Sequence, residues 1–241
     1  MQEKNNSSKL LACFSPLVMI TTFGIEIILL LYVAVRYGFN NVTRVVMATM
    51  LCLAVFQLAE YNVCEGSWGL DSLTWAKLGY VAITMLPPLG IHLACQIAGT
   101  KRLIAVASYL CAVIFIVFFI LVGNGIGSQA CLGNYVIFEV SPNWSNWYAL
   151  YYYGWIIASI VFCLKQIKKS IDEHQSRALK FLIAGNLSFL LPTTIVNTID
   201  PSTIRGIPSI MCGFAVILAV VLAIGVMPNY QKLLDKQARK K

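Results

Sequence analysis

Charged side chains are scarce in this sequence of 241 residues: Asp, Glu, Lys and Arg together make up only 12% of it. Soluble domains carry about 25% charged residues, so the chain has too little charge to coat the surface of a soluble globular protein. Histidine is scarcer still, with two residues, and the sequence contains neither a Cys-x-x-Cys nor a His-Glu-x-x-His motif. We therefore expect no metal site and no cofactor.

Apolar residues, in contrast, make up 59% of the sequence and give it a mean hydropathy of +0.75. A membrane-spanning helix needs about 20 apolar residues, and seven stretches approach or exceed that length. Seven such helices with short loops leave no room for a separate catalytic domain of ordinary size, about 100–150 residues. The predicted spans are residues 11–35, 42–63, 73–98, 103–122, 147–164, 178–199 and 207–227.

These spans predict an all-α membrane protein, a seven-transmembrane helix bundle that occupies residues 11–228. Residues 1–10 form a short extracytoplasmic N-terminus before it, and residues 229–241 form a basic tail after it. The first span is too long for a cleaved signal peptide, so we interpret it as an anchored helix. Within the loop at 123–146, residues 135–138 alternate and include β-branched side chains, which predicts a short strand.

Lys and Arg are distributed unevenly between the two sides of this predicted bundle. Fourteen of the eighteen fall on the side that carries the C-terminus, and cytoplasmic loops are those with excess Lys and Arg. We therefore expect the N-terminus outside and the C-terminus in the cytoplasm. The net charge of +8 then reflects topology and contact with anionic lipid headgroups, without a nucleic-acid partner. The four basic residues on the other side are Lys4, Lys9, Lys77 and Arg205.

Three motifs give the sequence a family resemblance. The second span ends near Leu-Ala-Glu-Tyr at 58–61. The third begins Leu-Thr-Trp-Ala-Lys-Leu-Gly-Tyr at 73–80, continues through Leu-Pro-Pro at 86–88 and ends in Gln-Ile-Ala-Gly at 96–99. The seventh span leaves the membrane through Ala-Ile-Gly-Val-Met-Pro-Asn-Tyr-Gln-Lys-Leu-Leu-Asp at 223–235. From about residue 11 to 235 the chain resembles the seven-transmembrane N-terminal sensor region of bacterial histidine kinases and related signalling proteins.

The resemblance implies a sensor or receptor module in the bacterial inner membrane. Family members usually continue into ligand-sensing, kinase or cyclase modules, whereas this sequence ends at Lys241, so we expect no enzymatic activity. The chain would perceive an extracellular or membrane-embedded cue and relay it to a separate cytoplasmic signalling protein, or form homo-oligomers. A small-solute transporter or channel is the alternative, although the proline-broken third span has no clear counterpart in a second half.

Other intramembrane classes lack their defining residues. A retinal protein needs a lysine in the last span, and residues 207–227 contain none. A metalloprotease needs two histidines on one helix, whereas His92 and His174 lie far apart. Ser188 has no histidine near it in sequence to act as a base. We interpret His174 as a solvated residue of a cytoplasmic loop and not as a phosphoacceptor.

Polar residues inside the spans are costly and by default face the interior of the bundle. Residue counting puts four of them at comparable depth, and His92 and Gln96 share a helix face because they are four residues apart. The set is either a polar cluster that titrates or rearranges during signalling or a group of hydrogen bonds between helices. Its members are Glu26, His92, Gln96 and Asn186.

A second polar set lies near the outer ends of the spans, where a pocket between helices could bind an extracellular ligand. The alternative is that these are ordinary interfacial residues that extend into the headgroups. The set consists of Glu60, Asn62, Tyr80, Trp147, Tyr148 and Asn197.

Three prolines and two cysteines could shape the bundle. Pro87 and Pro88 in the third span and Pro192 in the sixth remove backbone hydrogen bonds, which predicts hinges or purely structural kinks. Cys64 and Cys131 fall on the outer side. A disulfide between them could fasten the long outer loop in an oxidising compartment, and two free thiols are the alternative.

Overall fold

Long apolar segments form helices in this protein because a helix hydrogen-bonds its own backbone N–H and C=O groups, and lipid offers these groups no hydrogen-bond partners. The computed structural model describes residues 16–121, 126–131, 136–140, 142–199 and 207–239. In these residues, seven helices are long and apolar enough to cross a membrane, as predicted. They are Pro16–Tyr37, Asn41–Glu65, Ser72–Ala98, Leu103–Leu121, Asn143–Lys169, Glu173–Ile199 and Gly213–Ala238.

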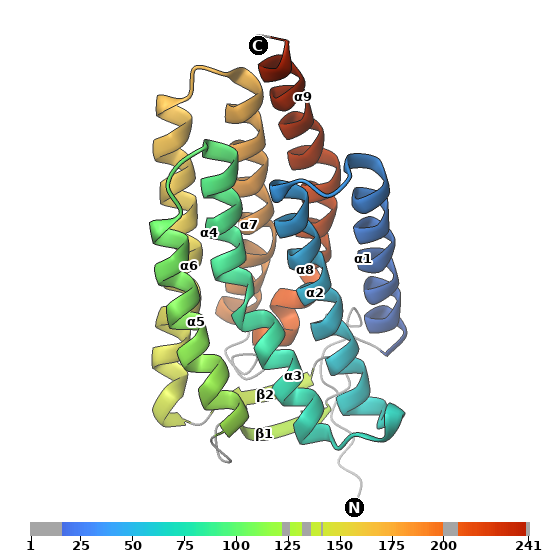
Figure 1. Cartoon of the computed structure of the whole chain (residues 1–241). Coiled ribbons are helices and arrows are strands. Elements are labelled where there is room, and N and C mark those ends of the chain that lie inside the picture. Colours follow the sequence, from blue (N-terminus) through green and yellow to red (C-terminus); the bar gives the residue numbers. More distant parts are fainter. Residues whose placement is uncertain (1–15, 122–125, 132–135, 141, 200–206, 240–241) are drawn as a thin grey trace, which may run out of the picture.

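The helices pack as a bundle with their axes running in roughly one direction (Figure 1). The first five are α1 (Pro16–Tyr37), α2 (Asn41–Glu65), α3 (Ser72–Thr84), α4 (Leu86–Ala98) and α5 (Leu103–Leu121). The rest are α6 (Pro142–Lys169), α7 (Glu173–Ile199), α8 (Ile207–Val221) and α9 (Met227–Ala238), with a π-turn, η4 (Leu222–Val226), between the last two. A short 3₁₀ helix, η2 (Ser67–Gly69), follows α2.

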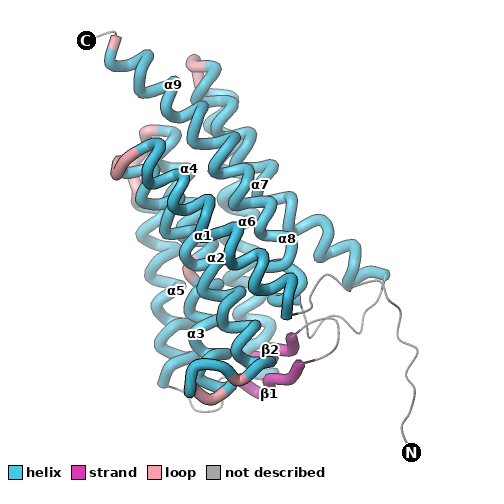
Figure 2. Tube along the Cα trace, turned by 90° about the vertical axis from the view of Figure 1, so that its right-hand side faces the viewer, coloured by secondary structure: helices cyan, strands magenta, loops and turns pink. Residues whose placement is uncertain are grey.

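The two ends of the bundle differ in structure, as Figure 2 shows, and they also differ in charge. The α1–α2, α4–α5 and α6–α7 turns and the end of α9 lie at one end, here called the basic end, with Arg36, Arg44, Lys101 and Lys169. At the other, the hairpin end, β1 (Ile126–Cys131) pairs antiparallel with β2 (Val136–Val140). The hairpin includes the strand predicted around residues 135–138, whereas its partner strand was not predicted.

Caps and left-handed glycines end the helices where the sequence supplies them. The Asn40 side chain accepts a hydrogen bond from the Thr43 backbone N–H at 2.9 Å and caps α2. Gly66 ends α2 with φ of 63° and Gly99 ends α4 with φ of 65°. Both residues adopt the left-handed conformation that glycine tolerates best, which places the turns to α3 and α5 directly after the spans.

Two predicted spans are interrupted. The stretch 73–98 is two helices, α3 and α4, which meet at Met85. Pro87 and Pro88 lie in the first turn of α4, where a missing N–H costs little, so the interruption precedes the prolines. The seventh span contains η4 and continues as α9 to Ala238, so most of the predicted tail is helical. Pro192, in contrast, lies within a continuous α7.

Two glycines allow α7 and the seventh span to pack closely. A Cβ added at Gly185 would lie 2.7 Å from Leu218 Cδ1, and one at Gly225 would lie 2.6 Å from Phe181 Cδ1. Small residues are used in this way where membrane helices approach closely. Gly185 is on α7 and faces α8, whereas Gly225 is in η4 and faces α7, so the two contacts are reciprocal.

Candidate functional site

Hydroxyl groups of α6 bridge the interruption between α3 and α4. Pro88 has no N–H to donate to the Thr84 carbonyl one turn earlier. The Tyr151 hydroxyl donates to that carbonyl instead, at 2.6 Å. The Thr84 hydroxyl donates to the Tyr80 carbonyl at 2.6 Å and lies 3.0 Å from the Tyr148 hydroxyl. Tyr148 and Tyr151 are three residues apart and so share a face of α6.

Stacked rings hold this tyrosine clamp, defined as Thr84, Tyr148 and Tyr151, in place. Tyr80 of α3 stacks on Phe119 of α5 with ring centroids 4.7 Å apart, and Tyr148 meets Phe119 edge-on at 5.2 Å. Tyr151 packs against another ring of α5, that of Phe115, at 4.9 Å. The clamp therefore joins α3, α5 and α6 at the point where the third span is interrupted.

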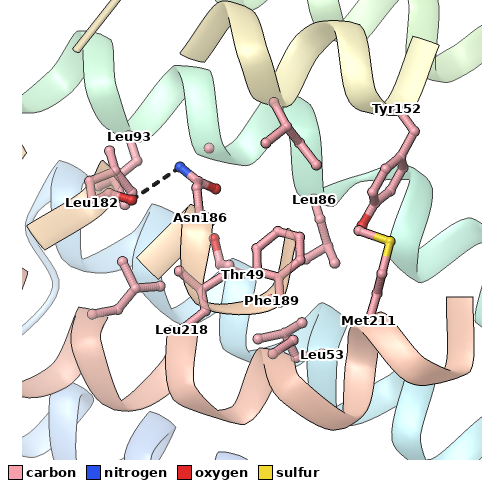
Figure 3. Close-up of a pocket in the computed structure, with 14 residues that line it drawn as sticks. Thr49, Leu53, Leu86, Leu93, Tyr152, Leu182, Asn186, Phe189, Met211 and Leu218 are labelled. Carbon is pink, nitrogen blue, oxygen red and sulfur yellow. Dashed lines mark hydrogen bonds between the residues drawn. The ribbon is translucent and has the colours of Figure 1, made fainter. Parts of the chain in front are cut away.

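A small cavity lies in the middle of the bundle (Figure 3). The space open to the centre of a water-sized sphere is about 20 Å³, enough for about one water molecule. Its wall is mainly apolar, and its members with polar side-chain groups are Thr49, Tyr152 and Asn186. Asn186 Nδ2 donates to the Leu182 carbonyl at 3.1 Å, and the amide oxygen is turned away from Leu182.

Two helix irregularities, together with the α7 segment before Pro192, converge on this cavity. Leu86 is the first residue of α4 after the interruption, and Leu222 is the first residue of η4. Phe189 lies three residues before Pro192 in α7. All three line the cavity together with residues of α2 and α6. The α3–α4 interruption and the seventh span therefore share one set of packing contacts around the cavity, so that a change in either one affects the same side chains.

The structure does not join the predicted intramembrane polar set into one cluster. His92 and Gln96 do interact: Gln96 Nε2 lies 3.1 Å from His92 Nε2, and His92 Nδ1 is hydrogen-bonded to the Tyr109 hydroxyl at 3.2 Å. Asn186 lies on the cavity wall, and Glu26 lies on the buried face of α1. Residues at comparable depth can still point in different directions around their helices. The prediction from depth therefore grouped four residues that the structure does not place together.

The predicted outer set also divides. The rings of Tyr80 and Tyr148 touch with centroids 5.7 Å apart, within the clamp region. Glu60 and Asn62 are 1% and 0% exposed on the last turns of α2. Trp147 is 62% exposed, because it precedes Tyr148 by one residue and so points about 100° away from it around α6. Asn197 is half-buried on α7.

Cys64 at the end of α2 is disulfide-bonded. The side chain of Cys131 lies outside the described residues, so its pairing with Cys64 stays a prediction. The backbone of β1, which Cys131 ends, packs against α2. Four other cysteines are free: Cys52, Cys95, Cys111 and Cys163. No cluster of three His, Cys, Asp or Glu side chains suited to a metal occurs in the described part.

Asp172 connects three elements at the basic end. Its Oδ1 accepts from the backbone N–H groups of His174 at 2.8 Å and Gln175 at 3.3 Å, which caps α7. Its Oδ2 accepts from Lys236 Nζ of α9 at 2.6 Å. This hydrogen bond lowers the pKa of Asp172. Gln175 Nε2 donates to the Ile97 carbonyl of α4 at 2.9 Å. His174 thus belongs to the half-buried first turn of α7, not to a solvated loop.

We expect the substitution Lys236→Ala to release the end of α9 with little loss of global stability. An exposed ion pair contributes about 0–1 kcal/mol, but this one joins α9 to the α6–α7 loop. Faster amide exchange at residues 233–238, measured by mass spectrometry, would show the release, and Lys232→Ala, an exposed neighbour, should not cause it. Because the pKa of Asp172 is lowered, its contribution is present near neutral pH and is lost as the pH falls below about 4.

The comparison with known families identifies the fold. Residues 18–233 match the family described as the N-terminal 7TM region of histidine kinase. The chain belongs to this family. No curated protein matches the sequence. The family resemblance inferred from the sequence is thereby confirmed, and the chain is a multi-pass membrane protein with a sensory role.

The match to this 7TM region includes the first seven residues of α9, up to Leu233, which is 5% exposed. The seventh span and the first part of α9 therefore belong to one family unit. Sequence reasoning missed Thr84 and Tyr151 as functional candidates. The sequence does contain a pattern that indicates Thr84. It lies four residues before Pro88, which has no N–H, so the Thr84 carbonyl must accept a hydrogen bond from another donor.

Proposed function

We propose that this chain is a non-enzymatic sensor of the bacterial inner membrane that relays a cue to a separate cytoplasmic signalling protein. In the proposed topology the hairpin end faces outward and the basic end faces the cytoplasm. The observation that carries the proposal is the convergence of the α3–α4 interruption, η4 and the Pro192 region on one cavity. Irregular segments of this kind are the parts of a membrane bundle that can change conformation at low cost.

The proposed cue acts on the outer half of the bundle. The candidate ligand residues there are Glu60, Asn62 and Asn197, beside Tyr80 and the clamp residue Tyr148. A cue that binds one arrangement of α6 better than another shifts the population of that arrangement. Because Tyr151 holds the Thr84 carbonyl, a shift of α6 alters the α3–α4 interruption directly. Pro87 and Pro88 then serve as the hinge.

The proposed relay runs through the seventh span. Leu86 and Leu222 line the same cavity, so a movement of α4 changes the packing of η4. A π-turn leaves helix hydrogen bonds that can be exchanged for regular ones, and such turns are frequent at functional sites. Gly225 keeps η4 against Phe181 of α7. A shift there moves α9, whose exposed residues at the basic end are the proposed contact with the partner.

Site-specific photo-crosslinking in native membranes tests the relay. A photoreactive residue at Gln237, exposed on α9, is expected to capture a signalling protein with a kinase or cyclase domain or a second copy of this chain. The matched control is Leu110, which is 64% exposed on α5 and should capture lipid. Capture of lipid alone at Gln237 would contradict the relay.

A transporter is the second candidate function, since a cavity and broken helices also occur in carriers. The cavity holds about one water molecule, which argues against passage of a larger solute. Counterflow measurements in liposomes that contain the purified chain distinguish the two functions. The sensor proposal predicts no solute exchange above that of empty liposomes.

A further inference from the structure

Helix α1 is attached to the bundle by a narrow stripe. In the described chain it buries only four side chains, those of Met19, Thr22, Glu26 and Val33. They follow one another at intervals of three, four and seven residues, so they share one face of the helix. The other residues of α1 are partly or largely exposed, including Leu17 at 73% and Val35 at 88%. An ionisable residue therefore lies in the middle of the one face that docks α1.

The carboxyl group of Glu26 is fully buried. Glu26 is 0% exposed, and neither of its carboxyl oxygens has a hydrogen-bond partner among the described residues. An acidic group acts on it electrostatically: this is Glu60 of α2, which is 1% exposed. A buried carboxylate without a cation or donors is very costly, whereas a carboxylic acid is not.

The elements packed against α1 supply no cation beside Glu26. These elements are α2, α8, η4 and α9. On α2, the described charged side chains besides Glu60 are Arg44 and Glu65, which lie at its two ends. Neither α8 nor η4 contains a charged residue. The basic residues of α9, like Arg36 of α1 itself, lie at the basic end. A proton is thus the cation that this site accommodates.

We propose that Glu26 is a proton-binding site and that the bound proton keeps α1 docked on the bundle. A proton from water adds to one carboxylate oxygen and gives a neutral acid, with no other bond formed or broken. Its release leaves a negative charge in the docking stripe, within range of the acidic Glu60, and the charge gains solvation only if α1 moves away. Since α1 also packs against α8 and η4, a change in the position of α1 alters the packing of the seventh span.

Infrared spectroscopy of the purified chain in liposomes detects the proton. The wild-type protein is expected to show a carboxylic acid C=O band that shifts in deuterated water, weakens as the pH is raised and is missing in Glu26→Gln. Glu65→Gln, at the exposed end of α2, is the matched control and should keep the band. If Glu26→Gln does not fold, Glu26→Asp, which should move the band without removing it, makes the assignment. A band unchanged by Glu26→Gln, or constant at every pH at which the bundle stays folded, would overturn the proposal.

Spin labels on α1 and α3, at Leu17 and Leu78, measure the docking. The distance distribution of the wild-type protein is expected to broaden and lengthen over the pH range in which the infrared band is lost. Glu26→Gln, a neutral isostere, should keep the narrow distribution throughout. The same broadening in both proteins, or none in the wild type while the band disappears, would show that the proton does not control α1. Proton binding is measured here without any cue or partner, so the result does not depend on the proposed sensory role.

Discussion

Tyr151→Phe is expected to destabilise the folded bundle by about 1–3 kcal/mol, the cost of leaving a buried hydrogen-bonding group unpaired. The substitution removes the hydroxyl that donates to the Thr84 carbonyl and keeps the ring that packs on Phe115. Thr84 is 0% exposed, so water cannot replace the lost donor without a local rearrangement. Thermal unfolding of the purified protein in detergent, followed by circular dichroism, measures the loss.

Tyr153→Phe is the matched control for this prediction. Tyr153 lies on the same helix, and its substitution by Phe also removes a hydroxyl. That hydroxyl donates to the sulfur atom of Met211, at 3.6 Å, and not to a backbone carbonyl. Its removal is expected to cost less than about 1 kcal/mol, because a thioether is a weak acceptor. Equal losses in Tyr151→Phe and Tyr153→Phe would mean that the clamp is not a special feature of the α3–α4 interruption.

Gly225→Val is expected to have a larger effect, because it places a branched side chain where even a Cβ meets Phe181 at 2.6 Å. Overpacking of this kind costs typically about 1–3 kcal/mol and sometimes more. The ring of Phe181 is 41% exposed and can swing aside only by giving up its contact with η4. We expect a lower unfolding temperature together with a displaced α9.

Gly154→Val on α6 provides the comparison for Gly225→Val. A Cβ at Gly154 would meet nothing within 4 Å, and both glycines lie inside a span. Valine at Gly154 should therefore leave the unfolding temperature near that of the wild type or raise it slightly, since glycine is a poor helix former. An unfolding temperature for Gly225→Val equal to that for Gly154→Val would contradict the close packing of α7 on η4.

The sequence could predict the parts of the fold that depend on depth in the membrane. Hydropathy alone predicts the seven helices, because a helix must be apolar over the thickness of the bilayer. The fifth and sixth begin a few residues before their predicted starts, and the seventh continues to Ala238, well beyond its predicted end at residue 227. Alternation around residues 135–138 was enough to indicate β2. The interruption at Met85 was not predicted, because proline was expected to kink the span where it stands, whereas its favoured place is the first turn of a new helix.

The candidate site depends on direction around each helix, which one sequence does not reveal. Trp147 and Tyr148 are neighbours at the same depth, yet one is exposed and the other packs inside the clamp. The hydrogen bond from Tyr151 to Thr84 joins residues 67 positions apart. Glu26 is one of the predicted intramembrane polar residues, but its place on the docking stripe of α1 required the packing of α2 and α8.

The proposed relay requires that the α3–α4 interruption and the seventh span change together. Spin labels at Lys101, in the α4–α5 turn, and at Gln237 on α9 measure this most directly, because they report on the ends of the two interrupted spans. We expect Tyr151→Phe to shift the distance distribution between these labels and Tyr153→Phe to match the wild type. Identical distributions in all three proteins, with Tyr151→Phe nonetheless destabilised, would contradict the proposed relay.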